Sequence, residues 1–393
     1  MGLNSILASS LRWSSTAATV ADADALLARL WASSEARRFL VSDSPKDPAV
    51  AEPIAVRTAV MNLAVVASGA ERAAHAASIL ATLPRNPSRT LFIVPRDPEG
   101  PATFAARLEV FCALTPRGDG TSACTELLWI DVGGPAAHHL ASIVPPLSLH
   151  DLPTLLWWDA PIDATESDVR QLLRGVDRVI VDGATQPGNG LATIRTLAHV
   201  AGTAGVALTD FALLRQGRWR DSIATMFDDE QAAPFLGAIN AISIDYAQGS
   251  VASIATNVVR PAYHVAWIAS RIAATVTSPL RLADEGGWRA QLLDPHRHPI
   301  SVELRPVESV LGAGTTTAVR ISADRRGDHF DLEVRADSTS TRAVARIDGA
   351  VVHERTFQAP RWTEATLLSE SLEFGEVDPL SPAILRTMSA LIG

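Results

Sequence analysis

The order of hydrophobic and polar positions divides the chain into two regions of different texture. From Val56, apolar runs rich in β-branched residues alternate with stretches of helical spacing. Such alternation favours a mainly parallel sheet covered by helices on both faces. The predicted strands are 56–67, 90–94, 104–114, 124–132, 152–158, 178–181 and 238–246, and the predicted helices are 71–83, 134–144, 167–173, 191–201, 209–227 and 253–276.

After Pro279 the pattern changes to short strands whose apolar residues alternate with polar ones. Turns such as Arg326-Gly327-Asp328 and Asp348-Gly349 separate them, and Asp-Gly between alternating strands is a strong hairpin signal. This region is predicted to be antiparallel. The predicted strands are 300–304, 316–322, 330–334, 343–347 and 351–357, followed by helices at 363–372 and 381–392.

The N-terminal residues differ from both regions. Residues 22–39 have helical spacing, and residues 42–53 form a loop rich in Pro, Asp and Ser. The predicted organisation is therefore a leader helix and linker over 1–55, an α/β domain over 56–278 and a smaller antiparallel α+β domain over 279–393. The fold class is α/β, with a mainly parallel, helix-covered sheet in the N-terminal part.

Composition narrows the range of functions. The 393 residues are 47% hydrophobic and 20% charged, which is typical of a globular protein. The formal net charge of −9 argues against a nucleic-acid binder, because such a protein needs a basic surface. Neither a secretory signal nor a membrane span is recognised in the sequence, so we expect a cytoplasmic protein without a membrane partner. Lys46 is the only lysine, which excludes a P-loop.

Motifs for catalysis and cofactor binding are missing from the sequence. It contains neither Gly-x-Gly-x-x-Gly between a strand and a helix nor a Gly-x-Ser-x-Gly elbow. The histidines of His138-His139 would face differently on a helix, and His296 and His298 lie in a polar loop where solvation is favoured over metal ligation. We therefore predict no catalytic residue, no cofactor and no metal.

The two cysteines, Cys112 and Cys124, lie on consecutive predicted strands joined by a Gly-rich turn. A hairpin would bring them within bonding distance. The favoured interpretation is two buried, reduced thiols. A redox pair is the alternative, and both residues are therefore redox candidates.

Tryptophan is the unusual aromatic residue, with 9 Trp against 2 Tyr. Trp157-Trp158 end a predicted strand, and Trp219 lies between Arg218 and Arg220. Trp and Arg contribute most to the binding energy of many protein interfaces. Core packing of the rings is the alternative. The candidate contacts with a partner are Trp158, Arg218, Trp219 and Arg220.

Several short runs occur in order along the chain: Asn86-Pro87-Ser88-Arg89-Thr90, Cys124, Ile143-Val144-Pro145-Pro146-Leu147, Leu152-Pro153-Thr154-Leu155-Leu156-Trp157-Trp158, Thr209-Asp210-Phe211, Arg218-Trp219-Arg220-Asp221 and Ala266-Trp267-Ile268-Ala269-Ser270-Arg271. Together they resemble the OpcA family of glucose-6-phosphate dehydrogenase assembly proteins. The resemblance implies a non-catalytic partner that promotes the assembly or activity of glucose-6-phosphate dehydrogenase, the entry enzyme of the oxidative pentose phosphate pathway.

Two alternatives remain at this point. One is a sugar-phosphate or nucleotide-binding α/β enzyme with a pocket at the carboxyl ends of the parallel strands, near Asp159, Asp182 and Gly183. The other is a scaffold that binds the dehydrogenase without changing its kinetics.

Overall fold

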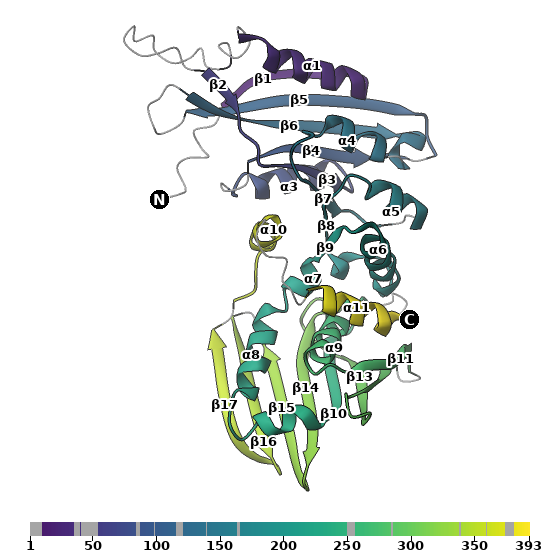
Figure 1. Cartoon of the computed structure of the whole chain (residues 1–393), viewed down its shortest axis with the longest axis vertical. Coiled ribbons are helices and arrows are strands. Elements are labelled where there is room, and N and C mark those ends of the chain that lie inside the picture. The colour runs from purple at the N-terminus through teal and green to yellow at the C-terminus, as the bar shows by residue number, and fades with distance from the viewer. Residues whose placement is uncertain are drawn as a thin grey trace. The chain divides into compact units, whose positions relative to one another are not determined.

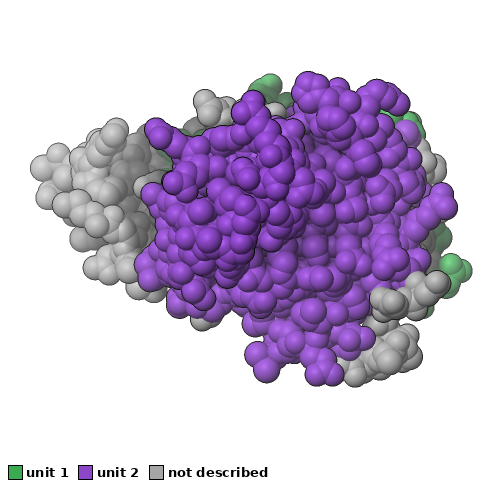
Figure 2. Space-filling view, turned by 90° about the horizontal axis from the view of Figure 1, so that it is seen from below, with its two compact units in different colours: residues 1–181, 200–208, 364–373 green, residues 182–199, 209–363, 374–393 purple. Residues whose placement is uncertain are grey.

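The structure, a computed structural model, describes residues 10–34, 40, 54–83, 87–97, 99–114, 121–138, 140–162, 166–249, 256–283, 286–337, 339–358, 360–373 and 381–393. Lys46, Asn86, His139 and the turn 115–120 therefore lie outside the described residues. The chain forms two compact units, coloured separately in Figure 2. Unit 1 consists of residues 1–181, 200–208 and 364–373, and unit 2 of residues 182–199, 209–363 and 374–393.

The sheet of unit 1 has the strand order β1-β5-β6-β4-β3-β7-β8-β9, with β2 paired to β6 (Figure 1). Strands β2, β6, β4, β3, β7 and β8 pair in parallel, whereas β1–β5 and β5–β6 are antiparallel. The sheet is thus rich in parallel pairs, as the sequence predicts. The strands are β1 Ser10–Ala17, β2 Ile54–Arg57, β3 Met61–Ala67, β4 Ser88–Pro95, β5 Thr103–Leu114, β6 Thr121–Gly133, β7 Thr154–Asp159, β8 Arg178–Val181 and β9 Ala207–Asp210.

Burial explains the apolar runs in the centre of this sheet. All seven residues of β3 are buried, as expected for a parallel strand covered on both faces. Helix α3 packs on β3 and β4, and α1 packs on β1 and β5. The helices up to β9 are α1 Val20–Ala32, α3 Ala70–Leu80, α4 Val144–Leu147, α5 Glu166–Leu172 and α6 Leu191–Ala204, with 3-10 helices η1 Gly134–His138, η2 Leu140–Ser142 and η3 Gly183–Thr185.

The sheet of unit 2 has the order β11-β12-β13-β10-β14-β15-β16-β17. Its neighbouring strands are antiparallel except for β10 and β13, which are parallel. The strands are β10 Ile239–Ala247, β11 Thr275–Leu282, β12 Trp288–Leu293, β13 Pro299–Val307, β14 Thr316–Arg325, β15 Asp328–Ala336, β16 Ser340–Ile347 and β17 Ala350–Gln358.

Two tight turns connect the strands of this sheet where the sequence predicts hairpins. In both turns, Arg326-Gly327 and Asp348-Gly349, each residue has a positive φ. That backbone conformation matches the twist of two-residue hairpins and suits Gly at the second position. The predicted hairpins are confirmed.

Helix α9 supplies much of the core of unit 2. Ten of its thirteen residues are buried, and it packs against β10, β13, β14 and α11. Helix α8 packs on β15 and β16. The remaining helices are α7 Phe211–Leu214, α8 Gly217–Phe227, η4 Ala233–Ala238, α9 Val259–Arg271, α10 Glu364–Leu372 and α11 Ser381–Ile392.

Several predicted element bounds are wrong. The expected helix 253–276 ends at Arg271, because Ala273 adopts a left-handed conformation and β11 begins at Thr275. The expected helix 209–227 is divided into β9, α7 and α8. Residues 10–17, predicted within the leader, form β1 and pair with β5.

The predicted strand at 238–246 forms β10, which pairs with β13 and β14 of the second sheet. The predicted boundary at 278/279 states that residues 56–278 and 279–393 fold as separate domains, and it stays a prediction. Among the described helices, none combines the length and the apolar character needed to cross a membrane.

Candidate functional site

The four predicted contact residues lie in both units. Trp158 is the penultimate residue of β7 in unit 1 and is 8% exposed, while Trp219 lies on α8 in unit 2 and is 5% exposed. Arg218 and Arg220 flank Trp219 and are half-buried. The two rings therefore belong to the cores of their units, and the role of these residues at an interface stays a prediction.

Trp219 is held in place by its neighbours in unit 2. Its ring meets that of His264 on α9 edge to face, with 5.3 Å between the centroids. Arg218 beside it donates a hydrogen bond to the backbone oxygen of Asp337, at 2.9 Å. Both Arg218 and Trp219 contribute to the wall of one pocket.

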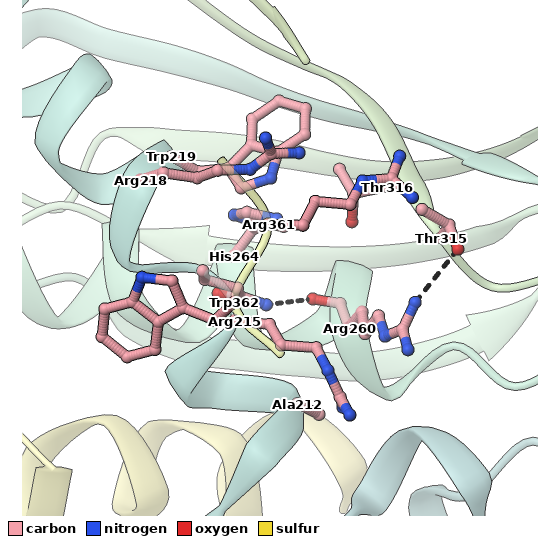
Figure 3. A pocket seen from close by; sticks show the side chains of 11 residues that line it. Ala212, Arg215, Arg218, Trp219, Arg260, His264, Thr315, Thr316, Arg361 and Trp362 are labelled. Atoms are coloured by element: carbon pink, nitrogen blue, oxygen red, sulfur yellow. Dashed lines mark hydrogen bonds between the residues drawn. The ribbon is translucent and has the colours of Figure 1, made fainter. Parts of the chain in front are cut away.

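This pocket has a volume of about 200 Å³ and is built from five parts of unit 2 (Figure 3). Helices α7, α8 and α9 contribute to it, together with the start of β14 and the segment that follows β17. We call it the arginine pocket. Its arginines are Arg215, Arg218, Arg260 and Arg361, and its other polar residues are Gln216, His264, Thr315 and Thr316.

The wall of the arginine pocket carries an excess of positive charge. None of the described residues that line it is an aspartate or a glutamate. Arg215 donates to Asp182, which lies behind the wall, at 2.7 Å. Arg260 donates to the neutral hydroxyl of Thr315, at 3.0 Å. The cation of Arg260 thus faces a hydroxyl group rather than a carboxylate.

The electrostatics of the pocket reflect this excess. Burial lowers the pKa of Arg260, and the positive charges of Arg215 and Arg361 lower it further. The negative charges of Asp182 and Asp210 partly oppose this shift. Burial also lowers the pKa of Arg218, with a contribution from Arg361. The guanidinium groups remain charged and repel one another. An anion in the pocket would relieve that repulsion.

Four buried polar atoms of the pocket residues have no hydrogen-bond partner: Gln216 Oε1, Arg260 Nε, His264 Nδ1 and Thr316 Oγ1. Gln216, His264 and Thr316 are 2%, 1% and 5% exposed. Buried polar atoms in folded proteins are nearly always paired, so a cluster of unpaired ones indicates a site for a bound molecule.

A hydrogen-bonded network behind the pocket supports its helices. Asp210 is 2% exposed and accepts hydrogen bonds from Gly183 N, Ala212 N and the Tyr263 hydroxyl, at 2.9, 2.7 and 2.9 Å. Burial raises the pKa of Asp210 to about 6, with repulsion from Asp182, although these hydrogen bonds oppose the shift. Asp210 thereby ties α7 and α9 to residue 183.

A side chain at residue 183 would collide with this network. A Cβ atom there would lie 2.5 Å from Asp210 Oδ2 and 2.8 Å from Ile194 Cδ1, so glycine is required.

The residues of the alternative pocket are already engaged. Asp159, in unit 1, accepts hydrogen bonds from Arg72 of α3, at 2.7 Å between Arg72 Nη2 and Asp159 Oδ1. Asp182, in unit 2, accepts from Arg215 and from Ala184 N. The arginine pocket forms elsewhere, among α7, α8 and α9.

The sequence indicates two of the residues in the arginine pocket, Arg218 and Trp219, and misses the others. Arg260 and Arg361 are far from them along the chain, and no spacing rule connects these positions. Arg361-Trp362 does repeat the adjacent Arg and Trp of Arg218-Trp219, and Trp362 is 43% exposed. Arg12-Trp13 on β1 carries the same pair outside the pocket, so the repetition by itself does not identify the pocket.

Cys112 and Cys124 form a disulfide between β5 and β6, with 4.1 Å between their Cα atoms. The favoured interpretation of two reduced thiols is therefore wrong. The pairing register places the two residues directly opposite each other. Their side chains are buried beside Leu30 and Val110. Redox control of function through this pair stays a prediction.

Several of the described histidines pair with single carboxylates, and His329 pairs with two aspartates. No group of three or more His, Cys, Asp or Glu side chains suited to a metal ion occurs among the described residues. His298 pairs with Asp294 at 3.0 Å, and the ring centroids of His296 and His298 are 6.3 Å apart.

Comparison with characterised proteins finds two relatives in cyanobacteria, each named as an OxPP cycle protein OpcA. The chain is 26% identical to the protein of Synechocystis sp. over 227 residues, which is 56% of this chain and 44% of the relative. It is 23% identical to the protein of Synechococcus elongatus over 218 residues, which is 55% of this chain and 45% of the relative. The chain thus matches less than half the length of either relative.

Several solved structures with an overall resemblance are oxidoreductases. One is KijD10, a 3-ketoreductase from Actinomadura kijaniata, with 13% identity, a TM-score of 0.45 and coverage of 84% of this chain and 95% of that one. Another is an NAD-binding oxidoreductase from Klebsiella pneumoniae, with 10% identity, a TM-score of 0.45 and coverage of 85% and 96%. TM-scores below 0.5 do not establish a shared fold.

Two family descriptions match most of the chain. The glucose-6-phosphate dehydrogenase subunit N-terminal domain matches residues 81–199, and the C-terminal domain of the same subunit matches residues 206–381. The short runs between residues 86 and 158 lie within the first match, and those between residues 209 and 271 lie within the second. The chain belongs to the OpcA family of glucose-6-phosphate dehydrogenase subunits.

Proposed function

We propose that this chain is a non-catalytic partner of glucose-6-phosphate dehydrogenase that promotes the assembly or activity of that enzyme in the oxidative pentose phosphate pathway. The observation that carries the proposal is the match of both subunit domains, in order, over residues 81–199 and 206–381. The names of the cyanobacterial relatives support the same pathway. The proposal includes a cytoplasmic location, where the phosphorylated sugar and nucleotide substrates of the enzyme are found.

The mechanism that we propose is differential binding. A partner that binds the active oligomer of an enzyme more tightly than its other forms shifts the population toward that oligomer. The shift cannot exceed the ratio of the two affinities, and about a tenfold ratio corresponds to roughly 1.4 kcal/mol. No catalytic group on this chain is needed for such an effect.

Arg218 and Arg220 are the contact candidates that reach the surface of unit 2, since both are half-buried. We propose that they contact the dehydrogenase through charge-assisted hydrogen bonds. Trp219 lies between them and packs against His264. It would act by holding the two arginines in position. Trp158 is the candidate of unit 1.

The test measures NADPH formation by the dehydrogenase of the same organism, with and without this chain, alongside gel filtration of the mixture. We expect co-elution together with a higher rate or a lower apparent KM for glucose 6-phosphate. Co-elution without a kinetic change would favour the scaffold and overturn activation. Loss of both effects under oxidising and reducing conditions would overturn the partnership.

Matched variants locate the contact. Arg220→Gln removes one candidate charge and should weaken co-elution. Arg355→Gln removes the charge of an exposed arginine on β17 and should leave co-elution unchanged. Equal effects of the two substitutions would show that net charge matters and that α8 is not the contact.

A further inference from the structure

The arginine pocket combines positive charge with concave shape on a protein whose formal net charge is −9. Figure 3 shows that its four arginines come from separate segments: the end of α7, α8, α9 and the chain after β17. Placing like charges together costs free energy unless an anion compensates them. Asp182, behind the wall, compensates Arg215, and the described wall supplies no carboxylate for Arg260 or Arg361. The compensating charge is therefore expected from a bound molecule.

The chemistry of the anion follows from the side chains that face it. Guanidinium groups offer planar pairs of N–H donors that match the oxygens of phosphate. Arg260 Nε and Thr316 Oγ1 are buried and unpartnered donors on the same wall. Several guanidinium groups around one small cavity match a dianionic phosphate monoester better than a single carboxylate, which needs only one arginine.

The rest of the ligand has to supply hydroxyl groups. The side-chain amide nitrogen of Gln216 donates to the backbone oxygen of Arg260, at 2.6 Å, which leaves Gln216 Oε1 as a buried acceptor without a donor. His264 Nδ1 is also unpartnered. Burial and Arg220 lower the pKa of His264 to about 3, so its ring is neutral at pH 7 and can share a hydrogen bond with a hydroxyl group.

The rim and the size of the pocket favour a single sugar ring. Trp362 lines the pocket next to Arg361 and is 43% exposed, which offers an apolar face to the carbon–hydrogen side of a sugar. The volume of about 200 Å³ lies below the roughly 300–1,000 Å³ of sites for larger ligands. A dinucleotide does not fit such a volume.

We propose that the arginine pocket is a binding site for a phosphorylated sugar. Its phosphate lies between Arg260 and Arg361, and its hydroxyl groups donate to Gln216 Oε1 and His264 Nδ1. The site belongs wholly to unit 2 and requires nothing from the dehydrogenase. The inference therefore goes beyond the proposed function, and either can fail without the other.

The experiment titrates the isolated 393-residue chain with glucose 6-phosphate and measures binding by calorimetry and by thermal unfolding. We expect one site per chain with a Kd below about 1 mM, the range of metabolite concentrations. A ligand that binds the folded state raises Tm as its concentration exceeds Kd. Glucose and inorganic phosphate should each bind at least about tenfold more weakly, because each lacks one half of the contacts.

Three variants assign the site. Arg361→Gln removes an exposed arginine of the pocket and should weaken glucose 6-phosphate about tenfold or more. Arg260→Lys keeps the charge but removes the planar pair of donors, and it should also weaken binding. Arg355→Gln removes an exposed charge on β17, outside the pocket, and should bind as the unaltered chain does.

Defined outcomes would overturn the proposal. The site is rejected if binding does not saturate at glucose 6-phosphate concentrations about tenfold above 1 mM. It is also rejected if the Arg361→Gln variant binds glucose 6-phosphate as tightly as the unaltered chain. Tighter binding of AMP than of glucose 6-phosphate replaces the sugar by a nucleotide and rejects the ligand class. The unaltered chain could fail to bind sugar phosphate while Arg361→Gln weakens co-elution with the dehydrogenase. That result would assign the arginines to a carboxylate of the partner instead.

Discussion

At the scale of single residues, Asp210 and His264 show how burial sets the charge of unit 2. Asp210 is 2% exposed and His264 1% exposed. Burial favours the neutral form of both, and it raises the pKa of the acid while it lowers the pKa of the base. The two side chains therefore give folding stability opposite dependences on pH.

We expect Asp210→Asn to change the pH dependence of stability in one direction. The pKa of Asp210 is raised to about 6 in the folded protein, so the folded state holds its proton longer than the unfolded state. This contribution is complete below the unfolded pKa of about 4 and is lost as pH rises through 6. Its size is on the order of 3 kcal/mol.

Urea unfolding at several pH values between 4 and 7 checks this expectation. The loss of stability assigned to Asp210 should be missing from the Asn variant. Asp221→Asn, which removes an exposed carboxylate on α8, serves as the control. A constant difference between the Asp210 variant and the unaltered chain over this range would contradict the assignment.

For His264→Phe we expect the opposite dependence. The pKa of His264 is lowered to about 3, so below the usual value of 6.5 the unfolded state takes up a proton that the folded state does not. Stability from this group is present above pH 6.5 and falls by about 2 kcal/mol down to pH 5. The Phe variant should lack that fall in the same unfolding series, whereas His150→Phe, at an exposed position, should retain it.

At the scale of elements, a buried ion pair joins the two strands β4 and β6. Arg89 and Glu126 are 4% and 1% exposed and lie opposite each other in the register, with 2.8 Å between Arg89 Nε and Glu126 Oε2. Trp31 of α1 donates to Glu126, and Arg89 donates to the backbone oxygen of Leu147 in α4. One pair thus fixes two strands and two helices of unit 1.

Replacing one partner of this pair should be costly. Glu126→Gln leaves the guanidinium of Arg89 buried without a counter-charge, and we expect the free energy of unfolding to fall by about 3–5 kcal/mol. The double variant Arg89→Met/Glu126→Leu removes both charges and should lose much less. Urea unfolding of the two variants measures the difference. A double variant as unstable as the single one would show that packing, and not charge, determines the loss.

The disulfide between β5 and β6 stabilises the same sheet, and Cys124 lies two residues before Glu126 on β6. Cys112 and Cys124 are separated by 12 residues, and closing a loop of that size restricts the unfolded chain by roughly 3 kcal/mol. We expect Cys112→Ala/Cys124→Ala to lower the free energy of unfolding by about 2–3 kcal/mol.

Reduction of the unaltered chain with a phosphine should reproduce the loss seen in the double Ala variant. The variant itself should not respond to the reductant. If reduction left the stability of the unaltered chain unchanged, the disulfide would not contribute to folding.

At the scale of the whole molecule, the proposed partnership with the dehydrogenase makes a quantitative demand. If the chain tightens the binding of glucose 6-phosphate to the enzyme by some factor, glucose 6-phosphate must tighten the binding of the chain to the enzyme by the same factor. We expect the two factors to agree within about twofold. Measurement of the Kd between chain and enzyme with and without the sugar phosphate provides the comparison.

The arginine pocket would add a second binding site to this measurement, so the same cycle is run with the Arg361→Gln chain. In that variant the pocket binds glucose 6-phosphate more weakly, so the site of the enzyme dominates the measurement. Unequal factors for the variant would show that the chain acts on the enzyme by a route other than a shift between its states.

Local patterns account for most of the elements. The bounds of α11 at 381–392 and the hairpin turn at Asp348-Gly349 agree with the sequence prediction, because helical spacing and turn chemistry are read from neighbouring residues. The pattern failed where the chain changes direction inside an apolar run, as at Ala273. Residues 10–17 were missed because an edge strand carries a weak apolar pattern, and three of those with described burial are exposed.

The sequence by itself therefore determined much of the succession of strands and helices, the change of texture towards the antiparallel sheet and, through its ordered runs, the family. The tertiary structure decided what the chemistry-bearing residues do. Register joined Cys112 to Cys124, burial removed Trp158 and Trp219 from the surface, and the fold brought Arg260 and Arg361 to one pocket. These outcomes depend on contacts between residues far apart in the chain, and local spacing carries no information about such contacts.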